Sequence, residues 1–246
     1  MTAIRIEELK GFDLRLESQP WAFANSERQR IDAHWQTCIA ANPRLWNGEV
    51  LICTNAQITD GNLAARFALT DFASFIAWRD WGWPDGSVLN CFGVAAVMSA
   101  DAALLFGVMG PHTLNAGLCY PPAGSLEPRD VLPDGRVDIR KSMSFELAEE
   151  TGLDSAAARP GRLLAIFDGP RLAVVEEYIF PHHFDEMQSI FHNHVEGNPA
   201  PELTSIEAIR SPAQIDRRMP LYAQHIVRMF APPVAQNGNL ANYHPL

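Results

Sequence analysis

The sequence predicts an α/β fold of the α+β kind, in which a mixed β-sheet is sandwiched by a few helices and preceded by an N-terminal α+β extension. Two observations support this fold class. Short apolar or alternating segments bounded by turn residues recur along the chain, which is typical of β-strands, and amphipathic segments lie between them. The composition, with 47% hydrophobic and 20% charged residues among 246, is that of a globular protein with a substantial core.

Residues 1–86 are expected to form the extension, and residues 87–246 the main domain. The boundary is placed at the turn cluster Trp83-Pro84-Asp85-Gly86. Within the extension, the pattern predicts strands over 4–10, 12–18, 48–59 and 62–70, a helix over 25–41 opened by Asn25 or Ser26 and ended by Asn42-Pro43, and a helix from near Thr70. Asp60-Gly61 between two of the strands is a strong hairpin signal.

Four aromatic residues in the last of these helices recur at three-residue steps: Phe72, Phe75, Trp78 and Trp81. This spacing favours a packing face, and a platform for stacking nucleic-acid bases is the alternative. In the main domain, the apolar stretch 92–110 predicts a buried β-hairpin, because Ser99 and Asp101 interrupt it and argue against a membrane-spanning helix.

The rest of the main domain alternates strands and helices. We expect strands over 118–122, 162–168, 171–180 and 202–211, helices over 138–151, 184–195 and 212–229, and an irregular tail from Ala231. Asp138 is the expected N-cap of the first of these helices, and Gly152 its C-terminal stop.

Charge and cysteine usage exclude several classes of protein. The formal net charge of −10 argues against nucleic acid or an anionic membrane as the main partner. The four cysteines, Cys38, Cys53, Cys91 and Cys119, are widely spread with no C-x-x-C pair, so free thiols are favoured over disulfides or zinc.

The N-terminus lacks the apolar region of a signal peptide, and a cytoplasmic location is expected. The His182-His183 and His192-Asn193-His194 groups favour a surface or hinge role over metal binding.

The segment that bears most directly on function is 122–153. Glu146, Glu149 and Glu150 follow the spacing i, i+3 and i+4, so their carboxylates share one face of the predicted helix and repel each other. Glu149 and Glu150 also lie in its last turn, where the helix dipole disfavours anions. A cation bound to this face would offset both effects, so the sequence predicts a metal site here.

This segment resembles the Nudix hydrolase signature, G-x5-E-x7-R-E-U-x-E-E-x-G-U, in which U is a bulky aliphatic residue. Residues 146–153 fill E-U-x-E-E-x-G-U, and residues 122–130, PAGSLEPRD, resemble the family's P-G-G-x-x-E-P-G-E opening. An insertion of about seven residues, VLPDGRV, follows Asp130. The resemblance is close over this motif and extends more loosely over roughly residues 87–230.

Two signature positions differ. Phe145 replaces the motif arginine, which in the family braces the loop and the glutamates by ion pairing. Asp130 replaces the first glutamate, or Val137 does if the insertion is ignored. Arg136 and Arg140 are the candidates to substitute for the missing arginine.

The resemblance implies a Nudix-type α/β/α sandwich that binds Mg²⁺, or alternatively Mn²⁺. Glu146, Glu149 and Glu150 would serve as metal ligands and catalytic residues, and a backbone carbonyl of Ala123 or Gly124 would complete the metal site. The general base is open between Glu146 and a later-loop carboxylate, either Glu196 or Glu202. His112, in a Gly-flanked loop, is a candidate contact to a ligand phosphate or ring.

The expected function is hydrolysis of the pyrophosphate bond of a nucleoside diphosphate linked to another moiety. The size of the extension favours a bulky substrate, such as a nucleotide sugar or a coenzyme A derivative. The alternative, which Phe145 keeps open, is a Nudix-like domain that has lost catalysis and binds a nucleotide or a protein partner. Homodimer formation is also left open.

Overall fold

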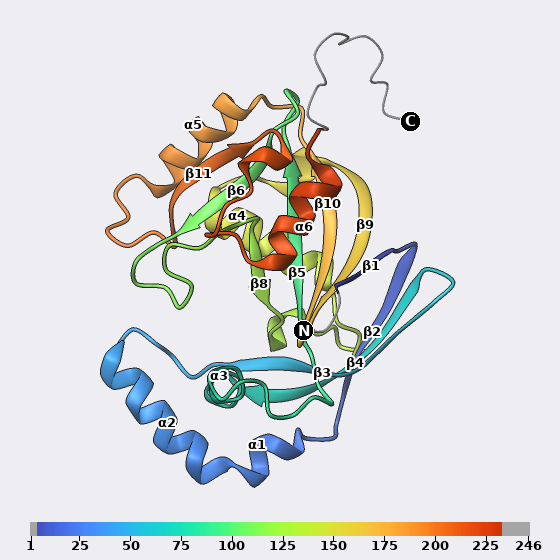
Figure 1. Ribbon diagram of the computed structural model, residues 1–246, viewed down its shortest axis with the longest axis vertical. Coiled ribbons are helices and arrows are strands. Elements are labelled where there is room, and N and C mark those ends of the chain that lie inside the picture. The colour runs from blue at the N-terminus through green and yellow to red at the C-terminus, as the bar shows by residue number, and fades with distance from the viewer. Residues whose placement is uncertain (1–3, 233–246) are drawn as a thin grey trace.

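The computed structural model describes residues 4–232. Six α-helices and eleven β-strands lie in this range (Figure 1). The helices are α1 (Ala22–Ser26), α2 (Arg28–Ala41), α3 (Phe72–Asp80), α4 (Ile139–Thr151), α5 (Phe184–Val195) and α6 (Leu221–Phe230). The strands are β1 (Arg5–Glu8), β2 (Gly11–Glu17), β3 (Glu49–Thr59), β4 (Asn62–Asp71), β5 (Asn90–Met98), β6 (Leu104–Met109), β7 (Cys119–Tyr120), β8 (Ala123–Ser125), β9 (Arg159–Asp168), β10 (Arg171–Ile179) and β11 (Leu203–Ile209). Short 3-10 helices span Pro128–Asp130, Ser155–Ala157 and Pro212–Gln214.

The strands form two mixed sheets. The larger has the order β1-β9-β10-β5-β6-β11, with β7 paired to β6 and β8 paired to β5. Its only parallel pair along this order is β10 with β5, and the other recorded pairs are antiparallel. The smaller sheet has the order β2-β4-β3, with β2 parallel and β3 antiparallel to β4. The predicted α+β fold with a mixed sheet is therefore confirmed.

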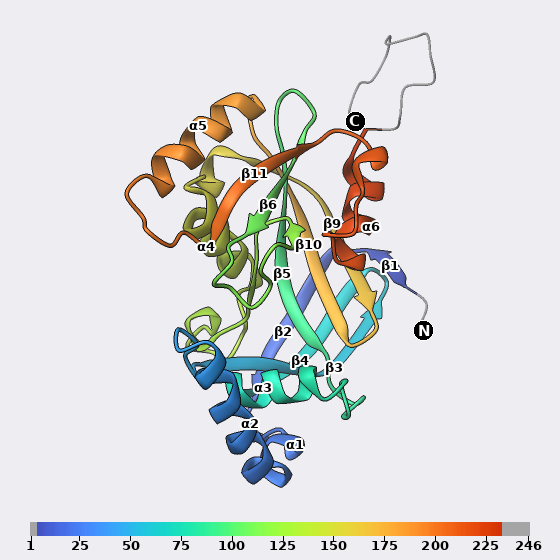
Figure 2. The same ribbon diagram turned by 60° about the vertical axis from the view of Figure 1, so that its left-hand side comes forward.

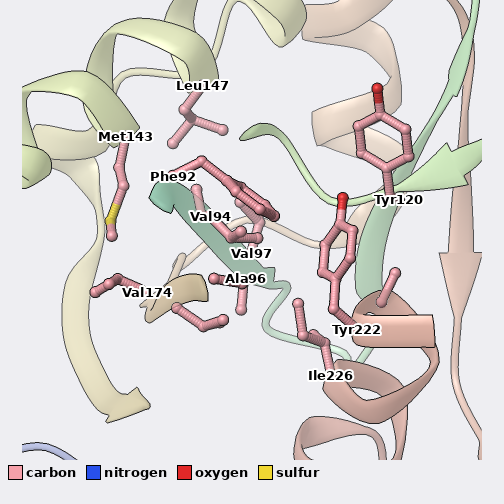
Figure 3. Close-up of a cluster of buried hydrophobic side chains, with 14 of the residues drawn as sticks. Phe92, Val94, Ala96, Val97, Tyr120, Met143, Leu147, Val174, Tyr222 and Ile226 are labelled. Carbon is pink, nitrogen blue, oxygen red and sulfur yellow. The ribbon is translucent and has the colours of Figure 1, made fainter. Parts of the chain in front are cut away.

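Helices α4 and α6 cover opposite faces of the larger sheet at β5 (Figure 3). Met143 and Leu147 of α4 reach the strand from one side, and Tyr222 and Ile226 of α6 reach it from the other. All four side chains are buried, and the strand between them is apolar on both faces, which explains the continuous apolar run that begins at residue 92. The run forms β5 and β6, which pair at Met98 and Leu104 beside their connecting turn, so the predicted β-hairpin is confirmed at this end. Further from the turn, β5 pairs with β8 and β6 with β7.

The smaller sheet lies between the main core and helices α1–α3 (Figures 1 and 2). Leu14, Leu51 and Leu63 belong to the main core, whereas Ile52 and Ala68 pack with Trp21 and Trp78 in a satellite cluster. Among the four aromatic residues of the predicted packing face, Trp78 is fully buried and Phe75 packs against the same cluster. A domain boundary at residue 86 stays a prediction, and β1 pairs with β9 of the larger sheet.

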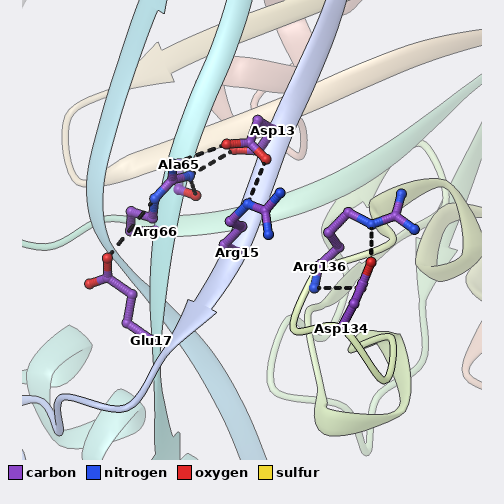
Figure 4. A network of polar contacts seen from close by, with 7 residues as sticks. All are labelled: Asp13, Arg15, Glu17, Ala65, Arg66, Asp134 and Arg136. Atoms are coloured by element: carbon purple, nitrogen blue, oxygen red, sulfur yellow. Dashed lines mark hydrogen bonds and ion pairs between the residues drawn. The ribbon is translucent and has the colours of Figure 1, made fainter.

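The seven-residue insertion, 131–137, contacts the N-terminal layer. It folds back on itself through a bridge between Val131 and Val137, and the backbone of Gly135 and Val137 exchanges hydrogen bonds with β2. Arg136 donates to Asp134 in this turn, beside the Asp13, Arg15, Arg66 and Glu17 network of the smaller sheet (Figure 4). The insertion thus joins the loop before α4 to the N-terminal extension.

Two predicted helices have different bounds. Residues 25–41 contain a break at Glu27, so α2 begins at Arg28, and neither Asn25 nor Ser26 caps it; the Ser26 hydroxyl instead donates to the carbonyl of Phe23. The helix expected over 212–229 is a 3-10 turn followed by α6, which begins directly after Pro220, as the fixed φ of proline favours. The tail expected from Ala231 lies mostly outside the described residues.

None of the four cysteines forms a disulfide, as predicted, and Cys38 is the least buried of them. Within residues 4–232, no helix is both long and apolar enough to span a membrane.

Candidate metal and substrate site

Helix α4 has the ends that the sequence predicts. The Asp138 carboxylate accepts a hydrogen bond from the backbone N–H of Lys141 at 3.0 Å, which satisfies a free donor in the first turn. Gly152 ends the helix with φ = 75°, a left-handed conformation that favours glycine. These caps fix the register of α4 and hence the face on which its three glutamates lie.

Strand β8 lies next to this face. Its Gly124 pairs with Gly93 of β5, and a Cβ at Gly124 would overlap the Glu146 carboxyl group. Glycine at this position therefore allows the backbone to approach the carboxylate closely. The backbone of Ala123 favours the charged form of Glu150 and opposes the upward shift of its pKa. The structure thus brings Ala123 and Gly124 together with two of the three predicted glutamates.

The three glutamates differ in burial. Glu146 and Glu150 are buried, whereas Glu149 is exposed. Burial raises the pKa of Glu146 to about 7, and burial followed by repulsion from Glu202, Glu146 and Glu149 raises the pKa of Glu150 well above its usual range. Without a cation nearby, it is energetically unfavourable for all of these carboxylates to be ionised at once. A divalent cation fits this set of oxygen donors.

The oxygens of the three glutamates are not gathered around one point. Within residues 4–232, the one group of three potential ligand atoms that all lie within 4.8 Å of each other is elsewhere in the chain. Glu146 is instead drawn to Arg129, whose Nη2 donates to its Oε1 at 2.8 Å. The exposed side chain of Glu149 is the one with room to turn towards a ligand.

Arg129 provides a cationic partner for Glu146 although Phe145 replaces the signature arginine. The guanidinium carbon of Arg129 lies 3.9 Å from the centre of the Phe145 ring, which is a cation–π contact. Phe145 therefore helps to hold Arg129, and Arg129 in turn pairs with Glu146. The candidates Arg136 and Arg140 pair with Asp134 and Glu176 instead. The expectation for these two was wrong because sequence spacing gives no sign that the 3-10 helix Pro128–Asp130 folds back onto α4.

A cleft of about 1070 Å³ opens between the two layers and is lined by Glu146 and Glu149, whereas the buried Glu150 does not line it. The main domain contributes Ala123, Gly124, Glu146, Glu149 and His112, and the N-terminal layer contributes residues from the end of α2 to α3. His112 lines this cleft, and its contact with a ligand phosphate or ring stays a prediction. Its carbonyl accepts a hydrogen bond from the side chain of Asn42 at 3.2 Å, which ties the loop to α2.

Of the two later-loop carboxylates, Glu202 lines the cleft, whereas Glu196 lies at the C-terminal end of α5. Desolvation of its carboxyl group and the negative charge of Glu149 raise the pKa of Glu202, and His112 opposes this shift. Tertiary structure is needed to separate these two residues, since both follow α5 in polar loops.

The cleft also contains residues that sequence analysis missed. Five arginines line it, namely Arg44, Arg79, Arg129, Arg171 and Arg217, beside Trp46 and Tyr222. Phe72 and Phe75, from the aromatic face that the sequence predicts, also line the cleft. Trp46 is 81% exposed. Arginines next to an exposed aromatic surface can bind phosphates and a flat ring. Only their convergence in space reveals them, because they are scattered along the chain.

The histidine groups have structural roles. His183 takes part in the capping box that begins α5, and the Nε2 atom of His194 lies 2.8 Å from the carbonyl oxygen of Glu149. The latter contact links the end of α4 to α5. The surface role predicted for these histidines agrees with these contacts.

Several solved structures are similar to this chain. The MutT protein from Methanosarcina mazei Go1 is 14% identical, with a TM-score of 0.38, covering 58% of this chain and 92% of that one. The NUDIX domain of Shewanella oneidensis NrtR, complexed with ADP ribose, is 10% identical, with a TM-score of 0.33. The match covers 49% of this chain and 71% of that one. A bifunctional NMN adenylyltransferase/ADP ribose pyrophosphatase from Francisella tularensis, complexed with AMP and Mn ion, is 18% identical, with a TM-score of 0.33. The match covers 55% of this chain and 38% of that one. No family model and no curated protein matches the sequence.

Proposed function

We propose that this chain is a Nudix-type pyrophosphohydrolase that uses Mg²⁺, or Mn²⁺, to cleave a nucleoside diphosphate linked to another moiety. The observation that carries the proposal is the placement of Glu146, Glu149 and Glu150 on one face of α4, against the backbone of β8 and beside a large cleft. The signature segment 122–153 supports the same conclusion from the sequence.

The metal would be held by the three glutamates and a backbone carbonyl of Ala123 or Gly124. When bound, it would neutralise charge on the phosphate oxygens and activate a water molecule. The raised pKa of Glu146, about 7, means that metal binding displaces a proton at neutral pH. Arg129 keeps the Glu146 carboxylate oriented through their 2.8 Å contact.

The residues of the cleft support a bulky substrate. Within residues 4–232, Arg44 and Arg217 form no ion pair with a carboxylate, so their guanidinium groups are free to bind phosphate oxygens. Trp46 offers an exposed ring for a nucleobase. The volume of about 1070 Å³ lies at the upper end of ordinary ligand pockets, which favours a nucleotide sugar or coenzyme A derivative over a smaller ligand.

Glu202 is our candidate for the group that accepts the proton of the attacking water. The water oxygen bonds to one phosphorus atom while the bond between the bridging oxygen and that phosphorus breaks. A carboxylate at the cleft wall with a raised pKa is suited to this proton transfer near neutral pH. Glu196 provides the matched comparison, because it follows the same helix but lies outside the cleft.

The test is a turnover assay with Mg²⁺ on a panel of UDP-sugars, ADP-ribose, NADH, diadenosine polyphosphates and coenzyme A, followed by phosphatase treatment and phosphate detection. Glu149→Gln and Glu150→Gln should each lower turnover by at least 100-fold, on the scale of lost electrostatic stabilisation. Glu202→Gln should lower it more than Glu196→Gln, the control. Tight nucleotide binding with no turnover on any substrate would instead support the alternative, a binding domain without catalysis.

A further inference from the structure

A second group of metal-ligating side chains lies in the N-terminal layer, where α2 contacts α3. His34, Cys38 and Asp80 each offer one ligand atom, and these three atoms all lie within 4.8 Å of one another. The Nε2 atom of His34 is 3.0 Å from Oδ2 of Asp80 and 3.5 Å from Sγ of Cys38. All three residues are separate from the glutamate face of α4.

We propose that His34, Cys38 and Asp80 form a binding site for Zn²⁺. Tetrahedral zinc with Zn–S near 2.3 Å and Zn–N near 2.0–2.1 Å places the sulfur and nitrogen about 3.6 Å apart, and nitrogen and oxygen about 3.3 Å apart. The observed separations of 3.5 Å and 3.0 Å are within a few tenths of an ångström of these values. Thiolate, imidazole and carboxylate are all ligands that zinc accepts.

Secondary structure positions the three groups before any metal binds. His34 and Cys38 are four residues apart in α2, so they lie on the same face one turn from each other. Asp80 is the last residue of α3, and the His34 ring packs edge-on against Trp81, with ring centres 5.8 Å apart. The helix pair thus holds the ligands, with only small side-chain adjustments required.

The Asp80 carboxylate has a partner that orients it. Arg79 donates to its Oδ1 atom from Nε at 2.9 Å and lies 2.8 Å away through Nη2, which leaves Oδ2 facing His34. Ligating carboxylates are commonly held by such outer hydrogen bonds. Arg79 therefore supports the site without occupying the ligand oxygen.

Three protein ligands leave the fourth tetrahedral position to water or to another donor. Zinc binding displaces the thiol proton of Cys38 and leaves the ring proton of His34 on Nδ1, with no change in oxidation state. The metal would link α2 to α3 beside the cleft, since Asn42, one turn after Cys38, and Arg79 both line it. The site is independent of the proposed hydrolase activity.

The experiment uses the full chain, freed of metal with a chelator, kept reduced, and titrated with Co²⁺ and then with Zn²⁺. We expect one Co²⁺ ion to bind with an intense near-ultraviolet absorption band from thiolate-to-metal charge transfer, and Zn²⁺ to displace it. The band reports a thiolate ligand, so Co²⁺ bound to the glutamates of α4 does not produce it. Zn²⁺ should also raise the thermal unfolding midpoint.

Cys38→Ser should abolish the band and weaken Zn²⁺ binding at least 10-fold, and Asp80→Asn should weaken binding while retaining the band. His192→Gln, an exposed histidine in α5, is the matched control and should behave as wild type. Circular dichroism shows which of the two variants, Cys38→Ser and Asp80→Asn, keeps the wild-type fold. The proposal is overturned if the wild type shows no thiolate band. It is also overturned if a variant that keeps the fold binds Zn²⁺ as tightly as the wild type does.

Discussion

Arg129 contacts both Glu146 and Phe145 of the signature segment. It pairs with Glu146 at 2.8 Å and lies over the Phe145 ring at 3.9 Å. A cation from the 3-10 helix Pro128–Asp130 thus faces Glu146, although the residue at the signature position is Phe145.

Arg129→Ala should lower turnover roughly 10-fold, since a hydrogen bond between charged groups is worth about 1.5–3 kcal/mol and this one is partly exposed to solvent. Phe145→Leu should have a smaller effect in the same direction, through the lost cation–π contact. Steady-state kinetics on the best substrate measure both. Arg136→Ala, whose side chain pairs with Asp134, is the control. Wild-type kinetics for Arg129→Ala would contradict this role.

The pKa of Glu146 predicts how stability depends on pH in the metal-free protein. Because its pKa is raised from 4.5 to about 7, the native state binds more protons than the unfolded state between these values. The stability from this group is thus fully present below the lower value and is lost as pH rises through the upper one. The loss is on the order of 3 kcal/mol.

Urea unfolding in the presence of a chelator, at about pH 5 and about pH 8, measures this dependence. Glu146→Gln should lose less stability over that interval than wild type, because glutamine does not titrate. Equal pH dependence of the two proteins would mean that Glu146 has an ordinary pKa in the native state.

At the scale of elements, the contact between β8 and α4 controls the metal face. Gly124 has no side chain, and the Glu146 carboxyl group fills the space that a Cβ would take. The strand backbone and the Glu146 carboxyl group are thereby in close contact, as the proposed metal site requires.

Gly124→Ala should therefore weaken Mn²⁺ binding and lower turnover at least 10-fold, because Glu146 must move away from β8. Calorimetric titration with Mn²⁺ and the turnover assay measure the two effects. Gly86→Ala is a matched control, since a Cβ there meets no atom within 4 Å and its backbone is not left-handed. Unchanged Mn²⁺ affinity in Gly124→Ala would place the metal away from this contact.

At the scale of the whole molecule, the N-terminal layer completes the cleft. The end of α2, the start of β3 and helix α3 supply one wall, and the signature loop and α4 supply the other. The insertion 131–137 links the loop before α4 to the N-terminal layer through its backbone contacts with β2. Both layers also share the main apolar core, so the walls are held in a defined geometry.

Trp46→Ala should raise KM roughly 10-fold with little change in kcat, because stacking of a base on an aromatic ring is worth about 1–3 kcal/mol and acts on bound substrate and transition state alike. Leu69→Ala removes another exposed apolar side chain, outside the cleft, and is the control. An unchanged KM for Trp46→Ala would show that this ring does not contact the substrate.

Sequence reasoning recovered most of the strands, the caps of α4 and the placement of its glutamates on one face, because these depend on local periodicity and capping, but it missed the short strand β8. It failed at the start of α2 and of α6, where a break at Glu27 and the constraint of Pro220 outweigh amphipathic spacing. It also assigned the supporting cation to Arg136 or Arg140. To identify Arg129 as the partner of Glu146, one must know how close the 3-10 helix Pro128–Asp130 lies to α4. Spacing along the chain does not give this distance.

The sequence by itself determined that Glu146, Glu149 and Glu150 crowd one face of a helix next to a glycine-containing loop. Helical geometry requires this of residues three and four apart, whatever surrounds them. Only the tertiary structure decided that Arg129 supports Glu146, that Glu202 and not Glu196 faces the glutamates, and that His34, Cys38 and Asp80 meet between two helices. Each of these depends on the packing of segments distant in the chain, because long-range contacts are set by the shared core and not by local spacing.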